Sequence, residues 1–250
     1  MKKMLMLANW KNNLDYLETK KFIKEFNNLI ETNSYKKSYE NIFKAYEIII
    51  APSYIGLGIL YEEQNKYWKI GAQNLSLYKK GPFTGEISAE ILNKLNVKYV
   101  ILGHSERRRF NFENNYDIYL KAKLALENNI TPIICVGENS IEYQKGITKE
   151  IIIKQLEETI KDLDKSQIII SYEPIWAIGN IAADAQVAND VCKFIKKWSK
   201  NQSKVLYGGS VNKISIAKLV NAEHIEGFLI GNASLDPQSF FDLITYKLNN

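Results

Sequence analysis

The chain has 250 residues and is poor in cysteine, histidine and proline, with two, two and five of each. Cys135 and Cys192 are too few for a disulfide framework, and no Cys-x-x-Cys or Cys/His cluster indicates a metal site. No apolar run approaches the ~20 residues that a membrane helix needs. The apolar run near the start, Met4–Ala8, is shorter than the ~7–15 residues of a secretory signal, so we expect a cytoplasmic chain without membrane partners.

A strong charge of either sign is also lacking. The 33 basic and 28 acidic side chains leave a net charge of +5, spread along the sequence. This mild excess is compatible with an anionic metabolite but too diffuse to indicate nucleic-acid binding. A hydrophobic content of 46% with 24% charged residues is typical of a globular protein.

Short apolar runs alternate with longer stretches of helical periodicity. Most of the runs are apolar at consecutive positions, as in parallel strands that are covered on both faces. The runs are Met4–Ala8, Ile48–Ala51, Trp68–Ala72, Tyr99–Leu102, Pro132–Val136, Ile168–Tyr172, Lys204–Tyr207 and Gly227–Ile230. Apolar residues recur at steps of three and four between them, for example at Ile152, Leu156 and Ile160. The pattern predicts a closed (β/α)8 TIM barrel, a single domain over residues 1–250; a doubly wound open sheet is the alternative.

Polar residues follow several of the predicted strands, at the end where such barrels carry their chemistry. Because side chains alternate along a strand, Asn9 and Lys11 share one direction and Trp10 takes the other. His104 follows the fourth strand, and we expect Ser105 to cap the next helix there. Taken alone, each has a plainer interpretation: a solvated lysine, or a histidine packed in a loop.

Glu173 ends the sixth strand and precedes an apolar loop that contains Ile175, Trp176 and Ile178. Such a loop indicates a lid that closes over the carboxylate and excludes water. The alternative is a permanently packed corner, with Glu173 in a structural ion pair.

Glycine-rich loops follow the last two strands, Gly208-Gly209-Ser210 and Gly231-Asn232-Ala233-Ser234. Glycines let backbone N–H groups approach an anion, and barrels of this class often bind phosphate there. Together with Lys11 the loops favour a phosphate ester as ligand. No Gly-x-Gly-x-x-Gly or Walker-type loop supports a nucleotide.

These motifs, in this order, resemble the triosephosphate isomerase family. The resemblance covers residues 9–235 and is carried by Asn9-Trp10-Lys11, Ala72-Gln73-Asn74, Gly81-Pro82-Phe83-Thr84-Gly85-Glu86, Gly103-His104-Ser105-Glu106-Arg107-Arg108, Pro132-Ile133-Ile134-Cys135-Val136-Gly137-Glu138, Tyr172-Glu173-Pro174-Ile175-Trp176-Ala177-Ile178-Gly179, Tyr207-Gly208-Gly209-Ser210-Val211 and Gly231-Asn232-Ala233-Ser234-Leu235. It implies an aldose–ketose isomerase of glycolysis and gluconeogenesis that interconverts dihydroxyacetone phosphate and D-glyceraldehyde 3-phosphate through an enediolate, without cofactor or metal.

The resemblance also implies roles for single residues. Glu173 would be the base, and neutral His104 the electrophile that polarises the carbonyl. Lys11 would bind the substrate and offset its charge, with Glu106 supporting the ammonium. The other substrate-binding residues would be Asn9, Gly179, Ser210, Gly231 and Asn232.

The family is typically a homodimer, in which the loop with Thr84 would insert beside the neighbour's active site. Glu86 and Arg107 would form a structural ion pair near that interface.

The sequence departs from the family pattern at two points. Gly179 is followed by Asn180-Ile181-Ala182 where the family has Thr-Gly-Lys, which alters the second hinge of the lid. Asn232 stands where a second glycine is common. Two other functions stay open on the residues alone: an isomerase or epimerase acting on a pentose phosphate, and a non-catalytic barrel that only binds.

Overall fold

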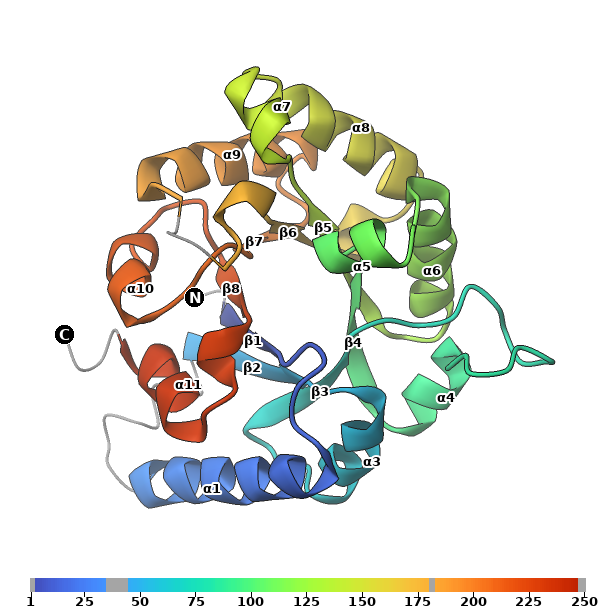
Figure 1. The fold of residues 1–250 in the computed structure, drawn as a ribbon, viewed down its shortest axis with the longest axis vertical. Coiled ribbons are helices and arrows are strands. Elements are labelled where there is room, and N and C mark those ends of the chain that lie inside the picture. Colours follow the sequence, from blue (N-terminus) through green and yellow to red (C-terminus); the bar gives the residue numbers. More distant parts are fainter. Residues whose placement is uncertain (1–2, 35–44, 180–182, 247–250) are drawn as a thin grey trace.

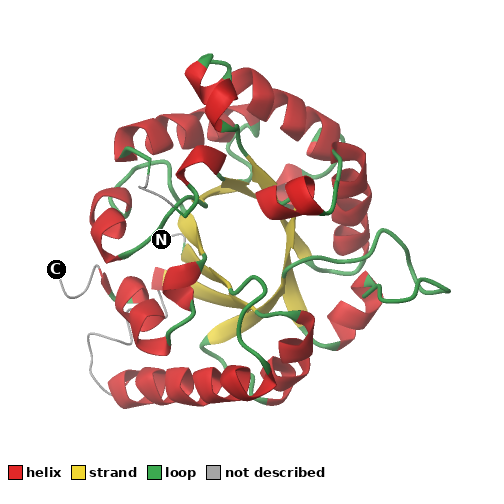
Figure 2. Cartoon of the chain, in the orientation of Figure 1, coloured by secondary structure: helices red, strands yellow, loops and turns green. Residues whose placement is uncertain are grey.

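The computed structural model describes residues 3–34, 45–179 and 183–246, and its strands form a closed barrel in the order β1 to β8. All strand pairs, including β1 with β8, are parallel, and helices surround the barrel (Figures 1 and 2). The strands are β1 (Met4–Asn9), β2 (Tyr46–Ala51), β3 (Trp68–Ala72), β4 (Val97–Leu102), β5 (Thr131–Val136), β6 (Ile169–Tyr172), β7 (Lys204–Tyr207) and β8 (Gly227–Ile230). The predicted barrel is confirmed, and closure rules out the open sheet.

Helices follow the strands as the periodicity predicts. The α-helices are α1 (Tyr16–Ser34), α3 (Tyr54–Glu62), α4 (Ala89–Lys94), α5 (Ser105–Phe110), α6 (Asn115–Glu127), α7 (Ser140–Gln144), α8 (Thr148–Ile160), α9 (Ala185–Trp198), α10 (Lys213–Leu219) and α11 (Pro237–Ile244). Short 3₁₀ turns are η1 (Lys165–Gln167), η2 (Ile175–Ala177) and η3 (Asn232–Ser234). Within the described ranges, no helix is long and apolar enough to cross a bilayer.

Side-chain alternation along the strands divides the core into two parts. One fills the barrel: Leu5, Leu7, Ile49, Ala51, Ile101, Ile133, Cys135, Ile169, Leu206 and Leu229. The other lies between strands and helices and includes Met6, Ala8 and Trp10 from the first strand and its loop. In β1 the odd-numbered residues therefore face inward, so Asn9 continues the inward row at the barrel mouth.

The loop between β3 and α4 projects from the barrel wall (Figure 1). Its rings of Tyr78 and Phe83 stack with centroids 3.9 Å apart, and Thr84 and Glu86 nearby are exposed. The loop is thus held by local contacts, away from the mouth of its own barrel.

Candidate active site

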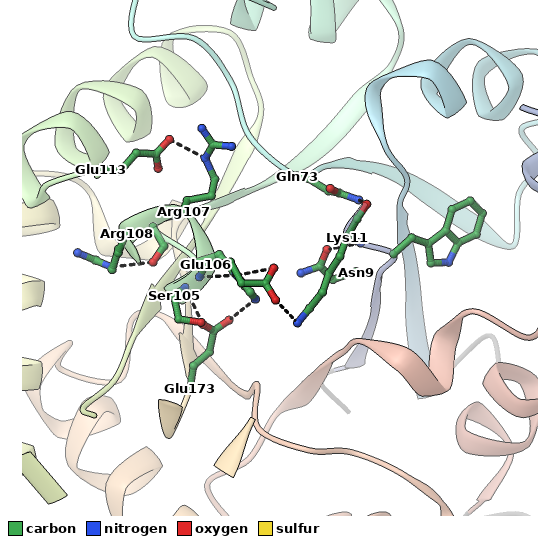
Figure 3. Close-up of polar contacts among 12 residues, drawn as sticks. Asn9, Lys11, Gln73, Ser105, Glu106, Arg107, Arg108, Glu113 and Glu173 are labelled. Carbon is green, nitrogen blue, oxygen red and sulfur yellow. Dashed lines mark hydrogen bonds and ion pairs between the residues drawn. The ribbon is translucent and has the colours of Figure 1, made fainter. Parts of the chain in front are cut away.

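Lys11 stands at the mouth of the barrel on a left-handed backbone, with φ of 52° (Figure 3). That conformation costs a non-glycine residue energy, so neighbours must hold it. The Lys11 N–H donates to Asn9 Oδ1 (3.1 Å), and Gln73 Nε2 donates to the Lys11 carbonyl (2.8 Å). The Lys11 ammonium reaches Glu106 Oε1 at 2.6 Å. The interpretation as a plain solvated lysine is therefore wrong, and Glu106 lies within ion-pair distance of the ammonium that the resemblance expects it to support.

Trp10 points the opposite way, as the alternation predicts. Its ring is fully buried and packs edge-on against Phe22, with centroids 4.6 Å apart. Its Nε1–H donates to the Ser234 carbonyl at 3.0 Å, which ties the loop after β1 to the loop after β8. Lys11 and the glycine-rich loop after β8 are therefore held in fixed relation.

His104 is the N-cap of α5, so the expectation that Ser105 caps this helix is wrong. The His104 Nδ1 accepts the Glu106 N–H at 3.2 Å, and Ser105 is the first helical residue. A ring nitrogen can accept a backbone N–H as a capping oxygen does. Because Nδ1 is the acceptor, Nε2 is the ring nitrogen assigned as the N–H donor. That nitrogen lies 3.6 Å from Glu173 Oε1.

Glu173 is a buried carboxylate, 1% exposed, at the end of β6. Its Oε2 accepts the Ser105 N–H at 3.3 Å, while its Oε1 has no hydrogen-bond partner (Figure 3). Its own N–H donates to the Val136 carbonyl at 2.8 Å, which fixes the strand end. A buried carboxylate with one unpartnered oxygen is costly to fold and is typical of a site that moves protons.

A cavity of about 280 Å³ opens between Lys11, His104 and the loops after β6, β7 and β8. Four other residues predicted to bind substrate also line it, namely Gly179, Ser210, Gly231 and Asn232. Asn232 does not adopt a positive φ, so the replacement of glycine there requires no left-handed backbone. The Ser210 hydroxyl donates to the Ala177 carbonyl at 2.7 Å and links two walls of the cavity.

The apolar loop after Glu173 divides into a packed part and a part at the cavity. Trp176 stacks on Tyr143 of α7, with centroids 4.3 Å apart, and its Nε1–H donates to Glu138 Oε1 at 2.9 Å. Ile178 instead lines the cavity. The altered hinge, Asn180-Ile181-Ala182, lies outside the described residues.

Glu138 is fully buried beneath this loop. Its Oε1 also accepts the Tyr172 hydroxyl at 3.1 Å, and its Oε2 has no partner. Burial raises the pKa of the Glu138 carboxyl, and the hydrogen bond from Trp176 opposes that rise.

A second cavity, about 200 Å³, lies on the other side of Lys11 and is lined in part by Asn9, Gln73 and Phe110. Arg107 also lines it, but the predicted ion pair with Glu86 is wrong. The Arg107 Nε donates instead to Glu113 Oε1 at 2.6 Å. Glu113 follows α5 closely in sequence, whereas Glu86 is exposed on the projecting loop.

Sequence reasoning names no role for several side chains that shape the site. Gln73 and Glu138 stand within recognised motifs, but their partners come from distant strands. Arg108 belongs to a basic run in the sequence, yet it makes three hydrogen bonds behind the site. In the described part of the chain, no three His, Cys, Asp or Glu side chains are grouped to hold a metal ion.

The fold and this arrangement together define a (β/α)8-barrel enzyme equipped for acid–base chemistry on a small molecule. A model of the family described as triosephosphate isomerase matches residues 4–247. Curated relatives named triosephosphate isomerase include one from Mycoplasmopsis pulmonis, 46% identical over 250 residues and 99% of both chains. Others are from Mesomycoplasma hyorhinis, 41% identical over 98% of this chain and 99% of the relative, and Dictyoglomus turgidum, 40% identical over the same shares. The chain belongs to the triosephosphate isomerase family.

Proposed function

We propose that this chain interconverts dihydroxyacetone phosphate and D-glyceraldehyde 3-phosphate as a step of glycolysis, with Glu173, His104 and Lys11 as its catalytic residues. Membership of the family supports the reaction. The observation that supports the residue roles is the 3.6 Å distance between Glu173 Oε1, which has no hydrogen-bond partner, and Nε2 of His104, which lines the cavity. This pair combines a base with a neutral N–H donor at one place.

In the proposed mechanism Glu173 removes a proton from the carbon next to the carbonyl. The electron pair left by the breaking C–H bond forms the enediolate, whose oxygens carry the new negative charge. His104 donates its Nε2–H toward these oxygens, and the Lys11 ammonium offsets the charge. Glu173 then returns the proton to the neighbouring carbon, while His104 transfers the hydroxyl proton from one oxygen to the other, so the isomerisation is balanced without an oxidant. A carboxylate base beside a neutral histidine is the division of roles known for this family, and the proposal carries it over to these residues.

The phosphate of the substrate is bound by Lys11 and by backbone N–H groups of the cavity loops. Gly179, Ser210, Gly231 and Asn232 are proposed for this role because all four line the cavity. The Ser210 hydroxyl already donates to Ala177, so we assign its backbone N–H to the ligand. Asn9 acts on the substrate indirectly, because its side chain accepts a hydrogen bond from the Lys11 backbone and so holds that lysine in place.

We test the function with Glu173→Gln, which keeps the shape of the side chain and removes the base. We expect kcat for triose phosphate to fall by roughly 10²–10⁴-fold, the usual contribution of a general base. The matched control is Glu90→Gln on the exposed face of α4, where kcat stays at the wild-type value. A Glu173→Gln variant with unchanged kcat removes Glu173 from this role.

The same assay separates the other functions left open by the sequence. Turnover of a pentose phosphate that chelator abolishes would favour the epimerase reaction. A barrel that merely binds would show no turnover while inorganic phosphate still raised its melting temperature.

The chain is further proposed to act as a single catalytic domain, as a homodimer and in the cytoplasm. The second cavity beside Lys11 supports the dimer, because it opens next to the catalytic lysine and offers a place for the partner's Thr84 loop. Thr84 lies on the projecting, exposed loop. In that arrangement Thr84, Glu86 and Arg107 belong to the interface.

A further inference from the structure

Three consecutive arginines occupy α5, and they differ in what they contact. Arg107 pairs with Glu113 at 2.6 Å, and exposed Arg109 lies over the ring of Phe110, 4.9 Å from its centroid. Arg108 makes no ion pair with a carboxylate among the described residues. It donates instead to backbone carbonyls at the ends of β4 and β5 (Figure 3).

The Arg108 guanidinium donates hydrogen bonds to three acceptors, which lie in three different segments of the fold. Nε donates to the Gly103 carbonyl at 2.7 Å, and Nη2 donates to the Cys135 carbonyl at 3.2 Å. Nη1 donates to Asn115 Oδ1 at 2.5 Å, at the start of α6. Burial lowers the pKa of this guanidinium, so keeping a cation here costs free energy.

The first acceptor belongs to the segment that carries the proposed electrophile, and the second lies in β5, the strand that pairs with β6 ahead of the proposed base. Gly103 immediately precedes His104. Its φ of 70° and the 3.0 Å between its would-be Cβ and Arg108 Nη2 leave no room for a side chain. On the other side, Cys135 pairs in register with Ser171 of β6, and the next carbonyl, Val136, accepts the N–H of Glu173.

We propose that Arg108 is a positioning residue that sets the separation of His104 and Glu173, because one rigid guanidinium binds the carbonyl before His104 and a carbonyl of β5, the strand that pairs with β6. The proposal rests on the catalytic roles given to His104 and Glu173 above. Arginine suits the task because its planar fork spans several acceptors, whereas an ammonium is a point charge on a flexible stem. A positive charge alone, as on lysine, is therefore insufficient to hold both carbonyls in place.

The test compares Arg108→Met and Arg108→Lys with Arg109→Met, the matched control on the same helix. Both Arg108 variants should lower kcat by about 10- to 100-fold, since a displacement of about 1 Å in a catalytic group has that effect. KM and the inhibition constant of inorganic phosphate should stay within about twofold, because the phosphate loops do not contact Arg108. Arg109→Met should retain wild-type kcat. Wild-type kcat in Arg108→Lys would overturn the proposal, since charge alone would then suffice.

A milder pair of variants serves where Arg108→Met does not fold. Asn115→Ala removes the third acceptor and leaves the arginine in place, and we expect kcat to fall several-fold, in keeping with a partly loosened catalytic group. Asn115 also donates to Glu158 Oε2 at 2.6 Å, so Glu158→Ala, which removes only that bond, is its control. The positioning role would be overturned if Asn115→Ala had the same kcat as wild type. It would also be overturned if kcat fell and phosphate inhibition weakened by an equal factor.

Glu173→Gln is measured beside these variants to keep the two proposals apart. An inactive Glu173→Gln with fully active Arg108 variants contradicts the positioning role alone. An active Glu173→Gln contradicts the proposed catalytic roles, whatever the Arg108 variants do.

Discussion

Gly208 follows β7 in a loop that the sequence predicts to bind phosphate, but the structure gives it a second role. A Cβ added there would lie 2.7 Å from Ser171 Oγ and 2.8 Å from Glu173 Cγ. The Gly208 N–H donates to the Tyr172 carbonyl at 2.8 Å, so the backbone is held in place. An alanine at this position must therefore displace the side chain of Glu173, the proposed base.

The size of the effect follows from the contact distance. Carbon atoms pack at about 3.5–4.0 Å, so Glu173 would have to shift by roughly 1 Å. A misplacement of that size costs about 100-fold in rate. Overpacking costs about 1–3 kcal/mol, and if all of it fell on the reactive geometry the rate would drop roughly 5- to 150-fold. We therefore expect kcat of Gly208→Ala to lie about 10- to 100-fold below wild type.

The assay is steady-state kinetics with triose phosphate, together with inhibition by inorganic phosphate and thermal unfolding. The control is Gly58→Ala in α3, where an added Cβ meets nothing within 4 Å. Alanine in a helix interior should stabilise the fold by about 0.5–1 kcal/mol relative to glycine and leave kcat unchanged. A Gly208→Ala enzyme with wild-type kcat refutes the reasoning. So does one that loses only phosphate inhibition, because the glycine would then serve the anion and not the base.

The barrel could be predicted from the sequence because strands buried on both faces are apolar at nearly every position. The run Ile48–Ala51 is one such case, and the structure extends it to Tyr46–Ala51. Strand ends cannot be predicted in the same way, since Glu47 and Lys98 interrupt the apolar pattern within β2 and β4. Glu47 still pairs with Leu5 of β1, because pairing depends on neighbouring strands as well as on side-chain polarity, whereas Lys98 lies at a register shift between β3 and β4.

The positions of Asn9, Lys11, His104 and Glu173 could be predicted because each closely follows an apolar run. The resemblance gives Glu106 as the partner of Lys11, but the backbone partners of His104 and Glu173 could not be predicted. Residue preference assigns the cap of α5 to Ser105, whereas the imidazole of His104 makes that bond. Preferences describe average caps, and tertiary packing decides this one.

The partner of Arg107 illustrates the same limit. Glu86 and Glu113 are both available in the sequence, and the choice depends on a loop that projects away from the barrel. The buried position of Glu138 is equally inaccessible to sequence reasoning, because its contacts with Tyr172 and Trp176 join separate segments across the β5–β6 edge.

Two further predictions concern assembly and pH. Sedimentation of the wild type should give about twice the chain mass of 28.8 kDa. Thr84→Arg should halve that mass, whereas the control Thr32→Arg, on the exposed face of α1, should leave it unchanged. A monomeric wild type would contradict the dimer. The pH prediction concerns Glu138, whose pKa burial raises above its usual value. The folded chain therefore retains this proton where the unfolded chain has lost it, so the stabilisation from this group is complete below the usual pKa and is lost as pH rises through the folded pKa. Glu138→Gln keeps an oxygen for Trp176 and Tyr172 but does not titrate. Urea unfolding measures the free energy of unfolding of Glu138→Gln and of wild type across pH. Above about pH 4.5, the usual pKa, the variant should gain stability relative to wild type as the pH rises. A difference between the two proteins that does not depend on pH would show that Glu138 ionises alike in the folded and unfolded states.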